Sequence, residues 1–344
     1  MRSFRKIKLN MRPDLLDKLI LAYLSDNAPS RTSVCENTGV CKASASKVAN
    51  ALIESGFMCE RLFSLTRNER PRLHLFLRDT VRILLIDLSN PRFKMSIISN
   101  EDSPIFESVY NYDSSINFDD NLNIFLSRCG LAVKHSEHRF CAISVLYADQ
   151  EQANAIRGTA FQARIPSIRQ KDVVSRAVYE IFRKMPDTHL TVSDALCESI
   201  RFNVKGSTIL NGSSYLFVGS KLLAFHLYKD GSKAVCSPEK LLTADEKKVL
   251  SQPHLMTKED IDDLFVKLCG FMDAAFSPSN VVLESDMHIP DDITAQRITR
   301  NFTLTGRSTP LISAKTNDLD LSSISKGILY NTVYSLIKCY ITVT

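Results

Sequence analysis

Residues 39–58 read GVCKASASKVANALIESGFM, and this stretch decides the fold of the amino-terminal part of the chain. Between Lys42 and Ser55 the apolar residues recur at helical spacing, at Ala45, Val48, Ala49, Leu52 and Ile53. We expect Gly56 to cap the end of this helix and Gly39 to supply a tight turn before it. The stretch therefore predicts a helix with one buried face and one polar face.

Two further helices are predicted before this one. Pro13 to Leu24 begins with a proline that the first turn tolerates, and its apolar face comprises Leu15, Leu16, Leu19, Ile20 and Tyr23. Arg31 to Thr38 follows as a short second helix. After the third helix, residues 58–77 alternate around a turn at 66–69, which predicts a two-stranded wing. Three helices and a hairpin in this order predict a winged helix-turn-helix.

The polar face of the third helix has the side chains that read DNA. Lysine binds phosphate or guanine, asparagine pairs with adenine, and serine bonds to either groove edges or the backbone. We also expect arginines of the second helix and of the wing to contact the DNA backbone. The candidate DNA-binding residues are Arg31, Lys42, Ser44, Ser46, Lys47, Asn50, Arg70 and Arg72.

The charge of the chain is concentrated in this amino-terminal part. Residues 1–78 contain 14 Lys and Arg against 7 Asp and Glu, a net charge of +7, whereas the rest contains 29 against 31, a net charge of −2. A basic head on a near-neutral body suits a protein whose head alone meets nucleic acid, because phosphate neutralisation supplies most non-specific affinity. A solvated basic tail is the alternative reading of the charge alone.

The head resembles the winged helix-turn-helix of the ROK family, which unites repressors and sugar kinases. GVCKASASKVANALIESGFM runs without a gap along the family's recognition helix, and ERPRLHLFL, from Glu69, is similar to its Gly-Arg-Pro-Arg wing motif. Cys41 stands where an N-capping serine is common, and Asn50 where a basic residue is common, so the operator sequence does not carry over. The alternative is a three-helix unit that contacts protein instead of DNA.

Beyond residue 79 the predicted elements alternate between strands and helices, which favours an α/β fold. Predicted strands are 81–88, 93–99, 105–110, 139–147, 189–192, 215–219, 221–228, 280–283 and 311–314; predicted helices are 120–129, 170–184, 193–203, 257–276, 291–302 and 321–339. Thr257 and Asp260 form a predicted capping box at one helix start.

This order resembles the two-lobed actin-like ATPase fold, a ribonuclease H-like fold, that ROK kinases use. The resemblance implies four segments: a winged helix-turn-helix at 1–78, a first lobe at 79–195, a second lobe at 196–320, and a carboxy-terminal helix at 321–344 that packs back on the first lobe. It also implies a homodimer, which suits the two half-sites that helix-turn-helix proteins bind.

The residues that bind phosphate in active ROK kinases are largely replaced. The Asp-x-Gly-x-Thr loop reads Asp87-Leu88-Ser89-Asn90-Pro91, and a Gly-Thr-Gly run reads Val218-Gly219-Ser220-Lys221-Leu222. Glu284-Ser285 replaces a nucleotide-side Gly-Gly pair. Glycine lets a backbone approach phosphate closely, so these changes oppose nucleotide binding.

The sugar-binding Glu-x-Gly-His segment and the cysteine-rich zinc loop of the family are missing, so we expect no bound metal or cofactor. Asp194 lies where the kinases keep their catalytic base, after Ser193 in place of an asparagine. A base without a phosphate cradle does not support phosphoryl transfer. We therefore interpret Asp87 and Asp194 as remnants of a catalytic site. Asp194 is expected to serve as a helix N-cap or ligand contact. The candidate ligand-binding residues are Ser193, Asp194 and Gly219.

Composition places the chain among soluble, cytoplasmic proteins. No apolar run approaches the roughly 18 residues of a membrane span, and the start lacks the apolar core of a secretory leader. The nine cysteines form no CxxC pair, as expected of free thiols in a reducing compartment. His135 and His138 fall in a charged run that reads as a solvated loop.

The sequence thus predicts a DNA-binding repressor, not an enzyme, that binds a double-stranded operator as a dimer. The body would act as a dimerisation scaffold and a sensor of a sugar or another small molecule. Two alternatives stay open: an active ATP-dependent sugar kinase, and a structural pseudokinase that binds no ligand.

Overall fold

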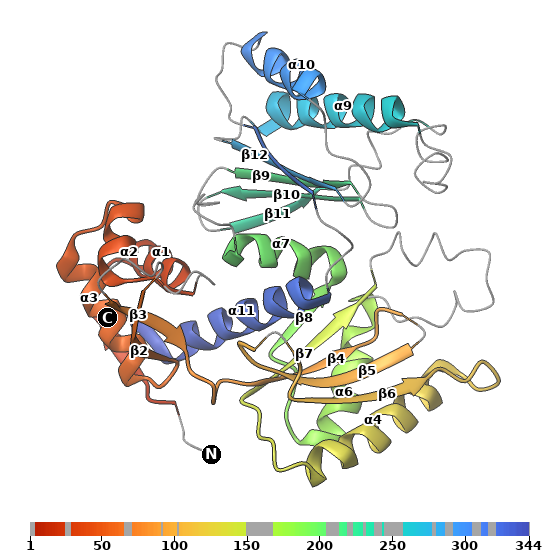
Figure 1. Ribbon diagram of the computed structural model, residues 1–344. Coiled ribbons are helices and arrows are strands. Elements are labelled where there is room, and N and C mark those ends of the chain that lie inside the picture. The colour runs from red at the N-terminus through yellow and green to blue at the C-terminus, as the bar shows by residue number, and fades with distance from the viewer. Residues whose placement is uncertain are drawn as a thin grey trace. The chain divides into compact units, whose positions relative to one another are not determined.

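The computed structural model divides into two units, one formed by residues 1–208 and 322–344, and one by residues 209–321 (Figure 1). The residues that it describes are 4–24, 29–64, 71–90, 92–101, 103–148, 168–203, 213–218, 223–229, 232–236, 243, 257–276, 280–285, 292–304, 311–315 and 321–343. No helix among these residues is long and apolar enough to cross a membrane.

The head consists of the helices α1 (Pro13–Tyr23), α2 (Arg31–Thr38) and α3 (Lys42–Glu54), followed by the antiparallel strands β2 (Met58–Phe63) and β3 (Arg72–Leu77). Pro13 opens α1, as expected, because the first turn needs no amide donor there. The helix α3 ends at Glu54 with Ser55 as its C-cap, so the predicted cap at Gly56 is wrong by one residue. Gly56 follows the cap with φ of +93°.

The first sheet has the order β6-β5-β4-β7-β8. Its strands are β4 (Ile83–Asp87), β5 (Arg92–Ile98), β6 (Phe106–Asn111), β7 (Ala142–Tyr147) and β8 (Thr188–Thr191). The pairs β4–β5 and β5–β6 are antiparallel, whereas β4–β7 and β7–β8 are parallel. This arrangement gives a mixed five-stranded sheet with β4 at its centre.

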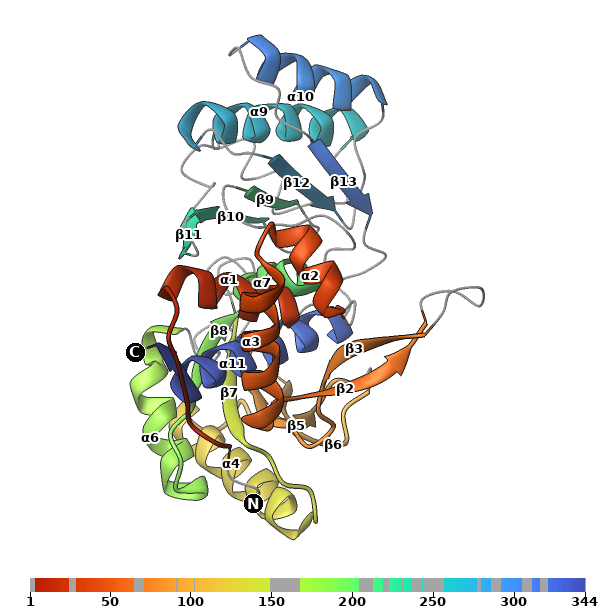
Figure 2. The same cartoon turned by 90° about the vertical axis from the view of Figure 1, so that its left-hand side faces the viewer.

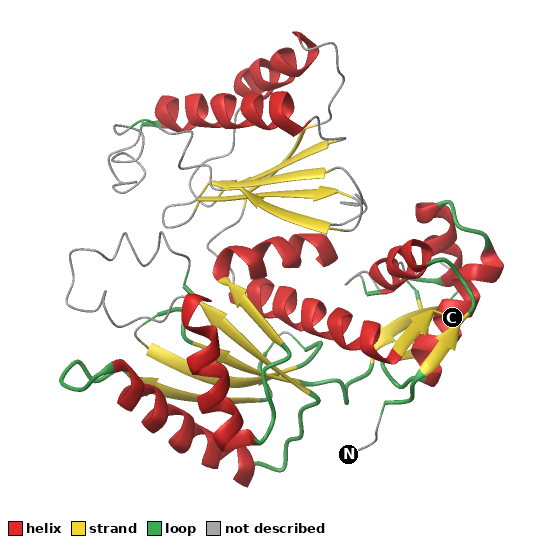
Figure 3. Ribbon diagram, turned by 180° about the vertical axis from the view of Figure 1, so that it is seen from behind, coloured by secondary structure: helices red, strands yellow, loops and turns green. Residues whose placement is uncertain are grey.

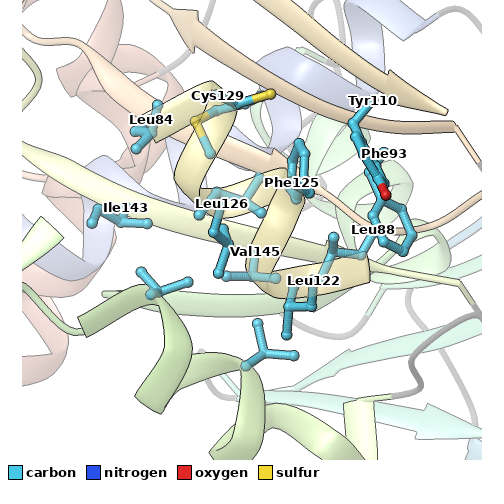
Figure 4. Packing of buried hydrophobic residues seen from close by; sticks show 14 of the residues in the cluster. Leu84, Leu88, Phe93, Tyr110, Leu122, Phe125, Leu126, Cys129, Ile143 and Val145 are labelled. Atoms are coloured by element: carbon cyan, nitrogen blue, oxygen red, sulfur yellow. The ribbon is translucent and has the colours of Figure 1, made fainter. Parts of the chain in front are cut away.

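Two helices cover one face of this sheet, α4 (Phe118–His135) and α6 (Lys171–Phe182), the latter preceded by the short 3-10 helix η2 (Ile168–Gln170) (Figure 3). Leu84 of β4 packs there with Phe125 and Leu126 of α4 (Figure 4). The same cluster contains Ile86 of β4 and Val178 of α6. The predicted helix at 120–129 is thus longer at both ends. Asn117 caps its start by accepting a hydrogen bond from the Asp120 amide at 2.8 Å.

The second unit repeats the topology of the first sheet. Its order is β11-β10-β9-β12-β13, again with two antiparallel pairs followed by two parallel pairs. The strands are β9 (Ser213–Val218), β10 (Leu223–Lys229), β11 (Ser232–Cys236), β12 (Asn280–Ser285) and β13 (Leu311–Lys315), and the helices are α9 (Lys258–Phe276) and α10 (Asp292–Leu304). Two such sheets after a winged helix-turn-helix confirm the predicted α/β fold class.

The carboxy-terminal helix α11 (Leu321–Tyr340) belongs to the first unit, together with α7 (Val192–Asn203). Thr332 of α11 and Thr188 of β8 share a hydrogen bond of 2.9 Å, and Thr188 donates to Ser144 of β7 at 2.8 Å. Tyr330 donates to Asn100 at 2.9 Å. These bonds join α11 to the first sheet.

The two chain ends meet in a sheet that the sequence did not predict. The strand β1 (Ile7–Leu9) pairs in parallel with β14 (Ile341–Val343), which directly follows α11. Lys338 of α11 also forms an ion pair with Asp17 of α1 at 3.0 Å. The head is therefore tied to the carboxy-terminal helix by both backbone and side-chain bonds.

Candidate nucleic-acid interface

The helix α3 follows α1 and α2 in the head (Figure 2), and its exposed side chains are mostly polar or basic. Ala45, Val48, Ala49, Ala51 and Leu52 of this helix are buried in the head. Lys42, Lys47 and Asn50 are exposed, and Ser44 and Ser46 are half-buried. The side chains predicted to read DNA thus lie on the solvent side of a helix whose other side is fixed in the core.

The pose of α3 is set by contacts with the two helices before it. Tyr23 of α1 is buried and donates a hydrogen bond from its hydroxyl to the Ala45 carbonyl at 2.9 Å. Burial raises the pKa of the Tyr23 hydroxyl far above its ordinary value, so it stays a donor at every physiological pH. Lys18 donates to the Thr38 carbonyl at 2.7 Å. The Tyr23 bond joins α1 to α3, and the Lys18 bond joins α1 to α2.

The start of α2 and the turn between α2 and α3 have the local structure that a helix-turn-helix needs. Ser30 and Ser33 form a capping box at the start of α2, in which the Ser33 amide donates to the Ser30 hydroxyl at 3.0 Å. Gly39 ends α2 with φ of +66°, a left-handed conformation that favours glycine. Cys41 is the N-cap of α3 and makes no side-chain cap bond.

Arg31 is held inside the head. Its Nε atom lies 2.7 Å from the Glu60 carboxylate of β2, and about a quarter of each side chain is exposed. This ion pair joins α2 to the wing. Because a guanidinium has five donor positions, Arg31 retains donors for a phosphate while the pair persists.

The wing exposes both cationic and apolar side chains. Arg72, the first residue of β3, lies opposite Phe63 and is exposed. Leu62 and Leu73, which pair across the two strands, are 70% and 52% exposed. Arg70 lies outside the described residues. The wing therefore offers a phosphate contact at Arg72 next to an apolar strip.

Asp87, at the end of β4, has its carboxylate satisfied by its own loop. The amide and hydroxyl of Ser89 both donate to Asp87 Oδ1, at 2.9 and 2.6 Å. Burial raises the pKa of this carboxyl group, and the Ser89 bonds and Lys94 partly oppose the shift. Asp87 is thus a buried residue engaged in a local turn.

Asp194 is not a helix N-cap, as the sequence suggested, but the third residue of α7. Thr191 is at the N-cap position, and its hydroxyl accepts a hydrogen bond from the Asp194 amide at 3.2 Å. The Asp194 carboxylate accepts in return from the Thr191 amide at 3.1 Å, which makes a capping box. Ser193 is the second residue of α7, and Gly219 lies outside the described residues.

Asp87 and Asp194 nevertheless lie at the same edge of the first sheet. Both β4 and β8 run parallel to β7, so the ends of all three strands meet at one edge. Strands two positions apart are separated by roughly 10 Å. This edge holds two carboxylates, each bonded to a hydroxyl and an amide of its own neighbourhood.

Among the described residues, no group of three His, Cys, Asp or Glu side chains is arranged to hold a metal ion. His135 is the last residue of α4 and is not part of a loop, because the helix extends beyond the predicted end at Cys129. Its neighbour in sequence, His138, follows the helix.

No protein-family model matches the chain, and no curated protein matches it. Among solved structures, it is similar to a ROK family transcriptional regulator that is a homologue of the E. coli MLC protein, at 12% identity over 93% of this chain and 97% of that chain, with a TM-score of 0.49. A glucokinase from Parabacteroides distasonis is 10% identical over 76% of this chain and 99% of that chain, with a TM-score of 0.47.

An inorganic polyphosphate/ATP-glucomannokinase from Arthrobacter sp. is also similar, at 10% identity over 75% of this chain and 99% of that chain, with a TM-score of 0.45. The similar structures thus include a regulator and sugar kinases. At these identities and scores they do not favour either activity, and the function has to be argued from the residues of this chain.

Proposed function

We propose that the chain is a sequence-specific DNA-binding transcriptional regulator that acts as a repressor. The observation that carries the proposal is the exposed face of α3, where Lys42, Lys47 and Asn50 point away from a well-packed helical core. A helix of this kind fits the major groove, where asparagine pairs with adenine and lysine with guanine.

The charge of the head supports the same proposal. Residues 1–78 have a net charge of +7, from 14 Lys and Arg against 7 Asp and Glu. Such a surface attracts duplex DNA, since neutralised phosphates release counterions. Arg72 in the wing and Lys42 at the start of α3 would bind phosphates and set the register of the helix in the groove.

We propose that the two lobes do not transfer phosphate and serve as a dimerisation scaffold and a sensor of a sugar or related metabolite. In support, the Asp87 carboxylate accepts two bonds from Ser89, and the Asp194 carboxylate accepts bonds from Thr191. Neither carboxylate is presented to a substrate by these bonds, and phosphoryl transfer needs positioned, charge-stabilising groups. A dimer would bind two half-sites of one operator.

The experiment that tests DNA binding is selection of bound duplexes from a random pool by the full chain, followed by titration of the selected duplex across salt. We expect an enriched two-fold symmetric site and an affinity that falls steeply with salt. A pool that stays random after repeated selection, with weak binding to every duplex, would refute the proposal.

An active sugar kinase is the second candidate, favoured by the ribonuclease H-like topology of the two sheets. It predicts ATP-dependent phosphorylation of a hexose panel at high protein concentration. We expect none. A ligand-free scaffold is distinguished from a sensor by thermal shift against sugars and sugar phosphates, since a ligand at 100 times its Kd stabilises by about 2.7 kcal/mol.

A protein-contacting head is the third candidate, and the exposed Leu62 and Leu73 of the wing favour it. Replacing both leucines by serine distinguishes a protein-contacting head from a DNA-binding head. DNA affinity would persist in a DNA-binding head, because the cationic contacts remain.

A further inference from the structure

The residues that precede α1 form an arm, residues 4–12, that is fixed to the head at its start. The Phe4 ring stacks on Phe57 with centroids 4.0 Å apart and planes 12° apart, and it meets the edge of Tyr340 at 5.5 Å. The Arg5 amide donates to the Ser55 carbonyl at 3.1 Å. The hydrogen bond between Arg5 and Ser55 places the start of the arm at the carboxy-terminal end of α3.

The middle of the arm is held by the other end of the chain. Ile7, Lys8 and Leu9 pair with Ile341, Thr342 and Val343 in the parallel β1–β14 sheet. Leu9 is buried and Ile7 is half-buried, whereas Lys6 and Lys8 are exposed. Side chains alternate between the faces of an extended chain, so Lys8 of β1 and Lys6, directly before the strand, share its solvent side.

The end of the arm contacts the middle of α3. Lys47 donates from its ammonium group to the Asn10 carbonyl at 2.8 Å. Lys47, Ala51 and Ser55 are spaced four residues apart and therefore lie along one stripe of the helix. Because Lys47 and Ser55 both bond to the arm, the arm runs along this stripe, directly beside the exposed face that carries Asn50.

The arm brings cations to this position. Arg5, Lys6 and Lys8 are exposed, and none of them forms an ion pair with another described residue. Arg12 differs, since its guanidinium is paired with Asp14. Three exposed cations, which form no ion pair within the described part of the chain, thus lie on a braced segment next to the helix proposed to enter the major groove.

We propose that the arm is a second DNA-contacting element, in which Lys6 and Lys8 bind phosphates that flank the groove occupied by α3. The inference rests on the proposed DNA-binding function and extends it to residues outside the helix-turn-helix. A cationic strand beside a recognition helix matches a polyanion that continues past the groove. Since the β1–β14 pairing already holds the strand in place, little ordering is needed on binding.

The two lysines are two residues apart on a strand, about 6.6 Å, so their flexible side chains reach neighbouring phosphates. Contacts to phosphate carry no sequence information. The arm therefore raises affinity for the selected duplex and for random duplexes alike, whereas Asn50 raises the preference for the selected one.

The test uses the full chain with the paired substitutions Lys6→Ala and Lys8→Ala. The matched control removes two exposed cations from the far end of α4 and the loop after it, Lys134→Ala and Arg139→Ala, which likewise lowers the net charge by two. A third variant, Lys6→Arg with Lys8→Arg, keeps both charges. Affinity for the selected duplex and for a shuffled duplex is measured from 50 to 300 mM salt.

We expect the Lys6→Ala, Lys8→Ala variant to lose at least tenfold in affinity for both duplexes at the lowest salt. The slope of log K against log salt should fall by about 1.8, the value for two phosphate contacts. The control should keep the wild-type slope, and the arginine variant should retain it. Unchanged melting temperatures show that each variant is folded.

A wild-type slope in the Lys6→Ala, Lys8→Ala variant overturns the inference about the arm while leaving the DNA-binding proposal in place. An equal loss in the control overturns it as well, because the effect is then one of net charge only. Failure of the wild-type chain to bind any duplex overturns both proposals, and this outcome is seen before any variant is made.

Discussion

The Lys47 ammonium of α3 and the Asn10 carbonyl are joined by a hydrogen bond of 2.8 Å, which connects α3 to the amino-terminal arm. An ammonium group has three donors, so Lys47 retains two for a base or a phosphate. The same side chain thus orients the arm and, in the proposed DNA complex, would face the groove. Its position on α3 was expected, but its bond to residue 10 was not.

Lys47→Ala and Asn50→Ala should each weaken binding to the selected duplex by about tenfold or more, because each would remove a base contact of the proposed complex. Binding to a shuffled duplex should change less. Both side chains are exposed, so urea unfolding should show little change in stability. Unchanged affinity in both variants would contradict α3 as the reading helix.

Arg72→Ala should weaken binding to selected and shuffled duplexes equally, because the proposed role of this exposed arginine at the start of β3 is to bind a phosphate and no base edge. The slope of log K against log salt should fall by about 0.9. The comparison with Lys134→Ala on α4 controls for net charge. A loss confined to the selected duplex would instead assign Arg72 to base reading.

Gly327→Ala should strongly destabilise the protein. A Cβ atom at Gly327 in α11 would collide with the backbone carbonyl oxygen of Ala195 and lie 2.6 Å from the Ser199 amide nitrogen of α7. Inserting an atom into such a closely packed contact lowers the free energy of unfolding by about 1–3 kcal/mol. The transition midpoint in urea measures this loss.

Gly270→Ala is the matched control for that substitution. Gly270 lies inside α9, and a Cβ atom there meets nothing within 4 Å. Alanine is favoured over glycine in a helix interior by about 0.5–1 kcal/mol, so this variant should be slightly more stable than the wild type. A loss at Gly270 equal to that at Gly327 would show that close packing is not the cause.

Asp194→Ala should reduce stability by about 0.5–2 kcal/mol, because the capping box of α7 loses its carboxylate acceptor. Asp194→Asn keeps an acceptor oxygen and should cost less. A double-mutant cycle with Thr191→Ala should show strong coupling, since the two residues bond to each other. Independent effects of the two substitutions would remove the capping role.

His189 should make the protein less stable as the pH falls below about 6.5. Burial lowers the pKa of this imidazole, and the charge of Lys171 lowers it further while Asp172 raises it. The ring lies 2.9 Å from the Tyr147 hydroxyl and 3.1 Å from the Ser175 hydroxyl. Tyr147 belongs to β7 and Ser175 to α6, and the lowered pKa leaves the ring neutral at pH 7.

The direction follows from proton linkage. The unfolded chain binds a proton near pH 6.5, whereas the folded chain binds it only at lower pH. Stability from this residue is therefore complete above pH 6.5 and is lost between that value and the folded pKa. His189→Gln should flatten the pH dependence of urea unfolding between pH 7.5 and 5.5. An unchanged slope would assign the pH dependence to other groups.

Local signals predicted the head well. Pro13, the apolar periodicity of the helices and the turn at Gly39 placed the limits of α1, α2 and α3 within one residue of those observed. The capping box of α9 also formed as predicted, with the Thr257 amide donating to Asp260 at 2.9 Å. Such features depend on residues three or four positions apart, which a sequence displays directly.

Contacts between distant residues were missed. The β1–β14 pair joins residues more than 300 positions apart, and no strand was predicted where β11 (Ser232–Cys236) lies. The ion pair of Arg31 with Glu60 and the bond of Lys47 with Asn10 likewise depend on how segments pack. No repeat is visible in the sequence, although the two sheets share one topology.

The sequence alone determined the helix-turn-helix and the alternation of strands and helices, because hydrophobic periodicity and capping residues act over a few positions. Only the tertiary structure decided that the chain ends form one sheet, that the arm lies along α3, and that Asp194 closes a capping box with Thr191. The reason is physical: a short strand such as β1 has no stability of its own and forms only where another segment supplies its hydrogen-bond partners.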